Sequence, residues 1–208
     1  MSLSRFFPFL AAFAGLMGAL FSGEPRTIVF FGDSLTAGYG LPDPATEAYP
    51  ALLQEKIASA GLAFRVVNAG LSGETTAGGL RRVDWILRQP VHVFVLALGA
   101  NDGLRGISPA VSQTNLQQII DRVRAKNPQA RLVLAGLQMP PSMGPDYANA
   151  FGAIFPALAE KNGAAFVPFL LDGVGGSTDL NQDDRIHPTA RGHAVIAETV
   201  WRVLRPLL

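Results

Sequence analysis

Four residues have the side chains of a nucleophilic site: two follow strand-like runs directly, and two lie just before the last helix-like segment. The stretch "IVFFGDSLTAGYG", residues 28 to 40, changes from an apolar run to small polar residues at Ser34. Asn101 follows a later apolar run, and Asp184 and His187 share the stretch "DDRIHP". A hydroxyl, an imidazole with an orienting carboxylate, and an amide donor are the groups that acyl transfer requires.

The chemistry of acyl transfer gives each of these residues a role. Ser34 is the candidate nucleophile, because a serine hydroxyl is a weak nucleophile until a base removes its proton. His187 is the candidate base, and Asp184, three residues earlier, can bend back to fix the imidazole. The tetrahedral intermediate needs donors for its negative oxygen, and the candidates are the amides of Ser34 and Gly70 and the side-chain NH₂ of Asn101. A helix cap or a turn remains the structural alternative for Ser34, Gly70 and Asn101.

The elements that must position these residues follow from the hydrophobic pattern. Near-continuous apolar runs are typical of strands covered on both faces, and they predict strands at 27–31, 64–69, 91–98, 131–137 and 164–169. Periodic segments between them predict helices at 47–60, 76–88, 109–126, 146–161 and 189–204. This alternation indicates an α/β fold with a parallel sheet between two helical layers. Ligands of such sheets bind outside the carboxyl ends of the strands, where the candidate residues lie.

Composition narrows the class of protein. The chain has 208 residues, a formal net charge of +1 and no run of basic residues, so the sequence indicates no nucleic-acid partner. It contains no cysteine, which excludes disulfides, thiolate metal sites and a cysteine nucleophile. His92 and His193 fall at a predicted strand start and inside a predicted helix, so we interpret both as structural.

The first 23 residues differ from the rest of the chain. One positive charge at Arg5 precedes an apolar run from Phe6 to Phe21. This pattern predicts a signal peptide or a short N-terminal membrane tether. We expect export, to the bacterial periplasm, with Ser22 or Gly23 as the last residue removed if the segment is cleaved, and one folded domain over 24–208.

Four ordered blocks resemble the SGNH (GDSL) hydrolase family. They are GDSL around Ser34, Gly70 after the second strand, GAND around Asn101, and DxxH at Asp184–His187. The stretches "DSLTAGYG", "AYPALL", "SGET" and "GANDGLRG" further resemble its exported bacterial arylesterases and acyl-thioesterase/lysophospholipases. The resemblance implies a flavodoxin-like three-layer α/β/α sandwich with a five-stranded sheet. It also implies no cofactor, no metal, and the roles already assigned to these five residues.

The substrate side of the site is less determined. A small-molecule or lipid ester or thioester is the expected substrate, and Leu104, Ile107, Met139 and Tyr147 are candidates to line an apolar groove for it. Ordinary core packing explains these four equally well. The glycine-rich stretch 70–79 is predicted to be a mobile loop that closes over ligand.

Three other functions compete with ester hydrolysis. The complete set of five site residues argues against one of them, a catalytically inactive lipid-binding or structural relative. A flavodoxin-like mononucleotide binder would also place Ser, Thr and Gly after its first strand, but it leaves Asn101 and the Asp184–His187 pair unexplained. A two-metal phosphoesterase would draw on more histidines than the three in this chain.

Overall fold

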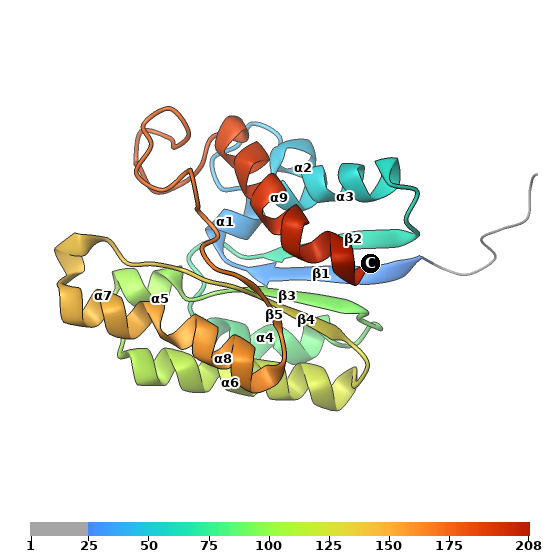
Figure 1. The fold of residues 1–208 in the computed structure, drawn as a ribbon, viewed down its shortest axis with the longest axis horizontal. Helices are drawn as coiled ribbons and strands as arrows, with labels where there is room; N and C mark the ends of the chain where they lie inside the picture. The colour runs from blue at the N-terminus through green and yellow to red at the C-terminus, as the bar shows by residue number, and fades with distance from the viewer. Residues whose placement is uncertain (1–24) are drawn as a thin grey trace, which may run out of the picture.

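The computed structural model describes residues 25–208, so the predicted leader over 1–23 lies outside the described residues. Figure 1 shows one parallel sheet between two layers of helices, as predicted. The strands are β1 (Arg26–Gly32), β2 (Phe64–Gly70), β3 (Val93–Ala97), β4 (Arg131–Ala135) and β5 (Ala165–Val167). None of the helices between residues 25 and 208 has the length and apolar character to cross a bilayer.

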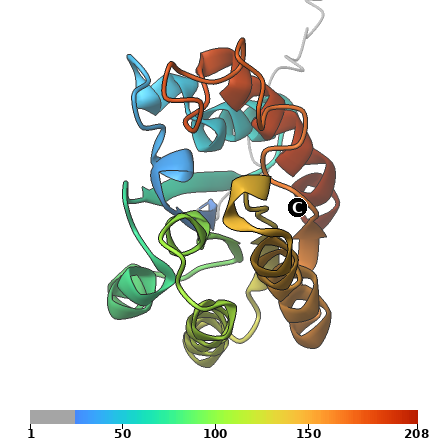
Figure 2. The same ribbon diagram turned by 90° about the vertical axis from the view of Figure 1, so that its left-hand side faces the viewer.

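The helices lie on both faces of the sheet. They are α1 (Ser34–Ala37), α2 (Pro44–Glu47), α3 (Tyr49–Ser59), α4 (Thr76–Ile86), α5 (Ala100–Leu104), α6 (Pro109–Lys126), α7 (Pro145–Gly152), α8 (Ile154–Asn162) and α9 (Ala190–Leu204), with 3₁₀ turns η1 (Pro141–Met143) and η2 (Arg205–Leu207). Figure 2 views the sheet from the carboxyl ends of the strands, with α3 and α9 over one face and α4, α6 and α8 over the other.

The predicted helix over 146–161 is two helices, α7 and α8, which meet at Ala153. Pro156 in the first turn of α8 has no amide hydrogen to donate to the carbonyl of Gly152, and its ring crowds that carbonyl. A helix therefore starts again after Ala153 and does not continue. The short helices α1, α2 and α5 were not predicted, because four or five residues carry no periodic pattern.

The order of the strands, β2-β1-β3-β4-β5, creates the binding position of this fold. From β1 the chain moves outward to β2, then returns across β1 to build β3, β4 and β5. The strand order therefore reverses between β1 and β3, and the crevice beyond their carboxyl ends is the expected ligand position. Ser34 follows β1 and Asn101 follows β3, so both candidates lie at this crevice.

The core explains why these strands form. The side chains of β1 from Ile28 to Phe31 and all five of β3 are buried, because helices cover both faces of these central strands. Aromatic rings fill the space between sheet and helices: Phe30 packs edge-on against Tyr49 of α3, and Phe31 packs against Phe94 of β3. This packing gives the residues that follow β1 and β3 a rigid base.

Candidate active site

Ser34 is the first residue of α1, directly after the turn that ends β1. Asp33 caps this helix, and its Oδ1 accepts a hydrogen bond of 3.0 Å from the amide of Leu35. Gly32 must be glycine, because a Cβ there would lie 2.0 Å from Oγ1 of Thr36 and 2.9 Å from the carbonyl oxygen of Ala97. The tight turn presents the Ser34 hydroxyl at the carboxyl edge of the sheet.

His187 and Asp184 reach Ser34 from the loop before α9. His187 Nε2 lies 2.9 Å from Ser34 Oγ, and His187 Nδ1 lies 2.6 Å from Asp184 Oδ2. The other carboxylate oxygen of Asp184 accepts hydrogen bonds from the amides of Ile186 and His187 at 2.9 and 3.0 Å. The His187 side chain and these amides lower the pKa of Asp184 to about 2. The structure thus brings together the three residues that the sequence predicts as nucleophile, base and orienting acid, and the acid in contact is Asp184 rather than Asp183.

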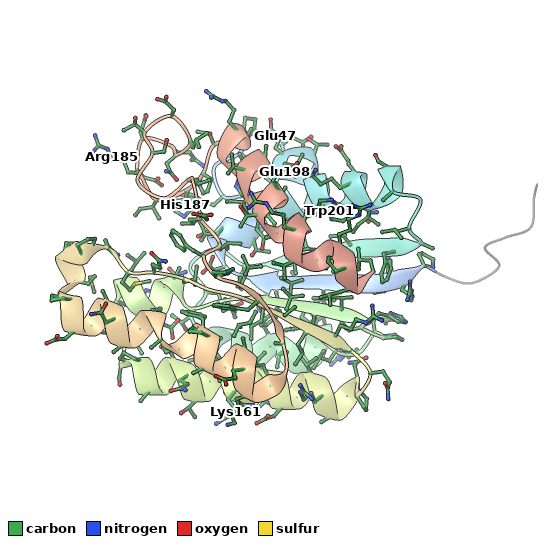
Figure 3. All side chains as sticks on the ribbon, in the orientation of Figure 1. Glu47, Lys161, Arg185, His187, Glu198 and Trp201 are labelled. Atoms are coloured by element: carbon green, nitrogen blue, oxygen red, sulfur yellow. The ribbon has the colours of Figure 1, made fainter. Side chains whose placement is uncertain are left out.

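One side chain fixes the loop that carries His187. Gln182 Nε2 donates to the carbonyl oxygens of Tyr39 at 2.8 Å and Pro188 at 3.0 Å, which joins this loop to the segment after α1. The ring centroids of Tyr39 and His187 are 4.6 Å apart. Figure 3 shows Arg185 of the same loop pointing outward, away from the sheet. The imidazole therefore has a restricted position beside Ser34.

Asn101 and a turn of the β2–α4 connection form the third part of the site. Asn101 lies in the first turn of α5, and its Nδ2 donates to the carbonyl oxygen of Glu74 at 3.1 Å. An amide NH₂ has two hydrogens, so this bond orients the group and leaves one hydrogen for another acceptor. Arg105 donates to the carbonyl oxygen of Gly73 at 3.1 Å, which ties the same turn to the end of α5.

Gly70 does not have the role that the sequence predicts. Its amide donates to Asn68 Oδ1 at 3.0 Å, whereas the amide of Leu71 donates to Gly32 of β1 at 3.0 Å. Successive amides of a strand point to opposite sides, so the Gly70 amide faces the outer edge of β2, away from the nucleophile. Glycine is needed for packing, because a Cβ would lie 2.3 Å from the backbone nitrogen of Ala37. The prediction of Gly70 as an oxyanion donor is therefore corrected to a packing role.

Buried carboxylates support the turns around these groups. Asp102 accepts from the amide and hydroxyl of Thr76 at 2.8 and 2.5 Å and from Ser112 at 3.2 Å, which joins α5 to the start of α4. Asp33 is fully buried, and Oδ2 has no hydrogen-bond partner among residues 25–208. Burial, with a smaller contribution from the charges of Asp102 and Glu74, raises the pKa of Asp33 to about 7. The described residues gather no group of three or more His, Asp or Glu side chains that could hold a metal ion.

The four predicted substrate-lining residues take different places. Leu104 is exposed at the end of α5, beside the site. Met139 is buried in the core, and the sulfur lies where a Cβ on Gly103 would stand. Tyr147 of α7 donates its hydroxyl to the carbonyl oxygens of Gly103 and Ile107 at 3.2 and 2.8 Å, so it supports the end of α5 and the turn that follows it. Whether any of the four contacts substrate stays a prediction.

The last four residues of the stretch 70–79 are helical. Thr76 begins α4, and Thr75 caps it by accepting from the amide of Gly78 at 3.2 Å. Buried Glu74 forms an ion pair with half-buried Arg82. Sequence reasoning missed this pair, since two residues eight apart across a helix start give no local signal. Closure of this stretch over a ligand stays a prediction.

A parallel α/β sandwich with a serine, a histidine and an aspartate in hydrogen-bond contact at its switch point defines a serine hydrolase class of site. The sequence profile of the GDSL-like Lipase/Acylhydrolase family matches residues 30–195. The chain belongs to this family, and it is an SGNH-type hydrolase. The alternative of a mononucleotide binder is not favoured.

Characterised relatives and solved structures agree with this assignment. The chain is 42% identical over 184 residues to Esterase TesA of Pseudomonas aeruginosa. This match covers 88% of this chain and 90% of the relative. It is 39% identical over 183 residues to Thioesterase 1/protease 1/lysophospholipase L1 of Escherichia coli, covering 88% and 85%. A crystal structure of TesA matches with a TM-score of 0.83 at 42% identity, covering 88% of this chain and 100% of that one. A psychrotrophic esterase EstA from Pseudoalteromonas, inhibited by monoethylphosphonate, matches with a TM-score of 0.80 at 34% identity, covering 87% and 97%.

Proposed function

We propose that the protein hydrolyses carboxylic esters or thioesters through an acyl-enzyme formed on Ser34. The observation that carries this proposal is the continuous hydrogen-bonded line from Ser34 Oγ through His187 to Asp184. As Ser34 Oγ attacks the carbonyl carbon, His187 Nε2 takes the hydroxyl proton. Asp184 holds the imidazole in the tautomer with its proton on Nδ1 and stabilises the imidazolium. His187 then protonates the leaving group, and a water activated by the same nitrogen releases the acid.

The negative oxygen of the tetrahedral intermediate requires donors that face Ser34. In our proposal these are the Ser34 amide, the free hydrogen of Asn101 Nδ2 and the amide of Gly73. The Gly73 amide makes no hydrogen bond among the described residues, and it lies in the turn held by Asn101 and Arg105. The positive φ of 78° at Gly73 is a conformation that suits glycine. Gly73 therefore replaces Gly70 in this proposal.

The substrate class is proposed from the surface around the site. Four of the large hydrophobic side chains exposed in residues 25–208 belong to the loops or the short helix that carry the site: Tyr39, Leu71, Leu104 and Ile186. An apolar rim around an ester-cleaving centre suits an acyl chain or an aryl group. Esters and thioesters of short to medium acyl chains, aryl esters and lysophospholipids fit this description. The names of the relatives, esterase, thioesterase and lysophospholipase, support the same range.

The experiment measures hydrolysis of p-nitrophenyl esters, acyl-CoAs and lysophosphatidylcholine by the wild type and single variants. Ser34→Ala is expected to abolish turnover and His187→Ala to reduce it nearly as far. Asn101→Ala should lower kcat by about 10²–10³-fold, the usual effect of removing one oxyanion donor. An ethylphosphonate probe should add its mass to the wild type at Ser34 and not to Ser34→Ala. Wild-type turnover by Ser34→Ala would overturn the proposal.

We also propose that residues 1–23 direct export to the periplasm, on the basis of the charge at Arg5 and the apolar run that follows it. Fractionation of cells expressing the full chain, with intact-mass measurement of the product, tests this. A periplasmic product that lacks residues up to Ser22 or Gly23 supports cleavage, and a full-length membrane-associated product supports a tether. Full-length protein confined to the cytoplasm would contradict export.

A further inference from the structure

Arg82 of α4 lies behind the site and is bound to three separate segments. Its guanidinium pairs with the Glu74 carboxylate through Nε and Nη2. Nη2 also donates to the carbonyl oxygen of Ala69 at 2.8 Å and to that of Gly32 at 3.3 Å. One planar group thus joins the carboxyl ends of β1 and β2 to the turn that follows β2.

The ion pair between Arg82 and Glu74 is largely shielded from water. The Glu74 side chain is 4% exposed and the Arg82 side chain 22%. The guanidinium carbon lies 4.1 Å from the ring centroid of Phe31. The charge of Glu74 is one of the smaller causes that raise the pKa of buried Asp33. Without a cation beside it, the Glu74 carboxylate would be buried, charged and close to another carboxylate, so it would have to move towards water or take up a proton.

The backbone of Glu74 connects this ion pair to Asn101. The carbonyl oxygen of Glu74 accepts the 3.1 Å hydrogen bond from Asn101 Nδ2, and the Glu74 amide closes the turn by donating to Leu71 at 3.1 Å. A displacement of Glu74 therefore changes both the orientation of the Asn101 amide and the turn that contains Gly73. These are two of the three oxyanion donors assigned above.

We propose that Arg82 is a positioning residue of the oxyanion site. It acts through Glu74, whose side chain it holds and whose backbone orients the Asn101 amide. This inference rests on the proposed function, since an oxyanion site has meaning only in an acyl-transfer enzyme. Preorganised donors stabilise the transition state only if they are held in place before charge develops. The chain therefore uses a half-buried cation outside the triad to maintain this geometry.

The kinetic test compares Arg82→Gln with Arg81→Gln on a p-nitrophenyl ester. Arg81 is exposed on the same helix and is the matched control. Arg82→Gln is expected to lower kcat about tenfold with KM within about twofold of wild type, because the donors act mainly in the transition state. Arg81→Gln should leave both constants unchanged. An unchanged kcat in Arg82→Gln would overturn the proposal.

A double-mutant cycle with Asn101→Ala separates positioning from a general structural effect. In the Asn101→Ala background, Arg82→Gln should lower kcat by about threefold rather than tenfold, because the Asn101 amide is absent and only the effect through the Gly73 turn remains. A second tenfold loss in that background would show that Arg82 acts independently of Asn101 and would overturn the proposal.

The side-chain NH₂ resonances of Asn101 give a readout that needs no activity. They are assigned by their absence in Asn101→Ala, and we expect them to shift in Arg82→Gln and not in Arg81→Gln. If esters are hydrolysed and the resonances do not move, the positioning role fails alone. If the resonances move and the wild type hydrolyses no ester, the proposed function fails and the structural link from Arg82 to Asn101 stands.

A second variant covers the case in which Arg82→Gln does not fold. Glu74→Gln keeps an acceptor for Arg82 and removes the charge, which weakens a charge-assisted hydrogen bond. It is expected to shift the same resonances and to lower kcat about threefold, less than loss of the guanidinium. Unchanged resonances and unchanged kcat in Glu74→Gln would overturn the proposal.

Discussion

Replacing Asp33 by asparagine should change how the stability of the protein depends on pH. Asp33 is fully buried next to the nucleophile, and its Oδ1 caps α1 while Oδ2 has no hydrogen-bond partner in the part of the chain that the structure describes. Asparagine keeps an oxygen for the amide of Leu35 and removes the ionisation. The substitution therefore separates the effect of the buried charge from that of the helix cap.

The magnitude follows from the pKa of the Asp33 carboxyl. Burial raises this pKa from 3.8 to about 7, so between these values the folded state holds a proton that the unfolded state has lost. The contribution of Asp33 to stability is then complete below pH 3.8 and is lost as the pH rises through the folded pKa. A difference of about three pKa units corresponds to about 4 kcal/mol, lost almost entirely between about pH 4 and 7.

A second buried group has the opposite effect over much of the same range. Burial, together with the charge of His187, lowers the pKa of His193 from 6.5 to about 4. Its contribution is present above pH 6.5 and is lost as the pH falls towards 4. In the wild type the two slopes therefore partly cancel. In Asp33→Asn the slope of His193 remains alone, and stability should rise with pH between about 4 and 6.5.

Urea unfolding followed by circular dichroism at several pH values from 4 to 8 measures the free energy of unfolding of the wild type and of Asp33→Asn. The free energy of unfolding of Asp33→Asn minus that of the wild type should increase by about 4 kcal/mol across this range. The exposed Asp172 provides the control, because Asp172→Asn should show a constant difference from wild type. If the Asp33→Asn difference is also constant, Asp33 does not hold a proton in the folded state and the reasoning is refuted.

Three further substitutions test other parts of the structure. Tyr147→Phe removes the hydroxyl hydrogen bonds to Gly103 and Ile107. It should lower the free energy of unfolding by about 1 kcal/mol and speed hydrogen exchange of the backbone amides between these two residues. Unchanged exchange would contradict the support role. Arg185→Gly places glycine at a φ of 58°, and should raise the stability by about 1 kcal/mol in thermal unfolding, whereas a fall would contradict backbone strain. Leu104→Ser should lower kcat/KM for medium-chain p-nitrophenyl esters about tenfold and change kcat/KM for p-nitrophenyl acetate by less than about twofold. Equal losses for both substrates would exclude a contact between Leu104 and the acyl chain.

The fold was largely predictable because its signals are local. Each strand is a short apolar run covered on both faces, and each long helix is a periodic segment of the right length. The division of 146–161 into α7 and α8 was missed. Pro156 is compatible with the first turn of a helix, so it indicates a break only when the start of α8 at Ile154 is known. The extra residues predicted for the third strand, such as His92, bond to neighbouring segments without belonging to β3.

The sequence predicted the site residues whose side chains do the chemistry. It did not predict the backbone amides whose direction depends on how the strands pair. Ser34, Asp184 and His187 need their own functional groups, so their types and order in the chain identify them. Gly70 was assigned wrongly because the direction of its amide depends on how β2 pairs with β1, which residues 64–70 alone do not specify. Arg82 was missed because it is one of 17 basic residues and lies in a helix, where a charge is typical of a solvated face.

The acidic residues near the nucleophile are explained by what they hold in place. Asp33 caps the helix that begins with Ser34, Asp102 ties α5 to the start of α4, and Glu74 fixes the turn beside Asn101. Burying three carboxylates in one region opposes folding, and among residues 25–208 a cation directly contacts Glu74 but neither Asp33 nor Asp102. Each carboxylate nevertheless fixes a turn at the carboxyl end of a different strand, β1, β3 or β2. If the turn that Asp33 caps is what places the nucleophile, then Asp33→Asn should be more stable relative to the wild type at pH 7 than at pH 4 and should have a lower kcat, because the unpartnered ionisable group is removed and the helix cap is altered.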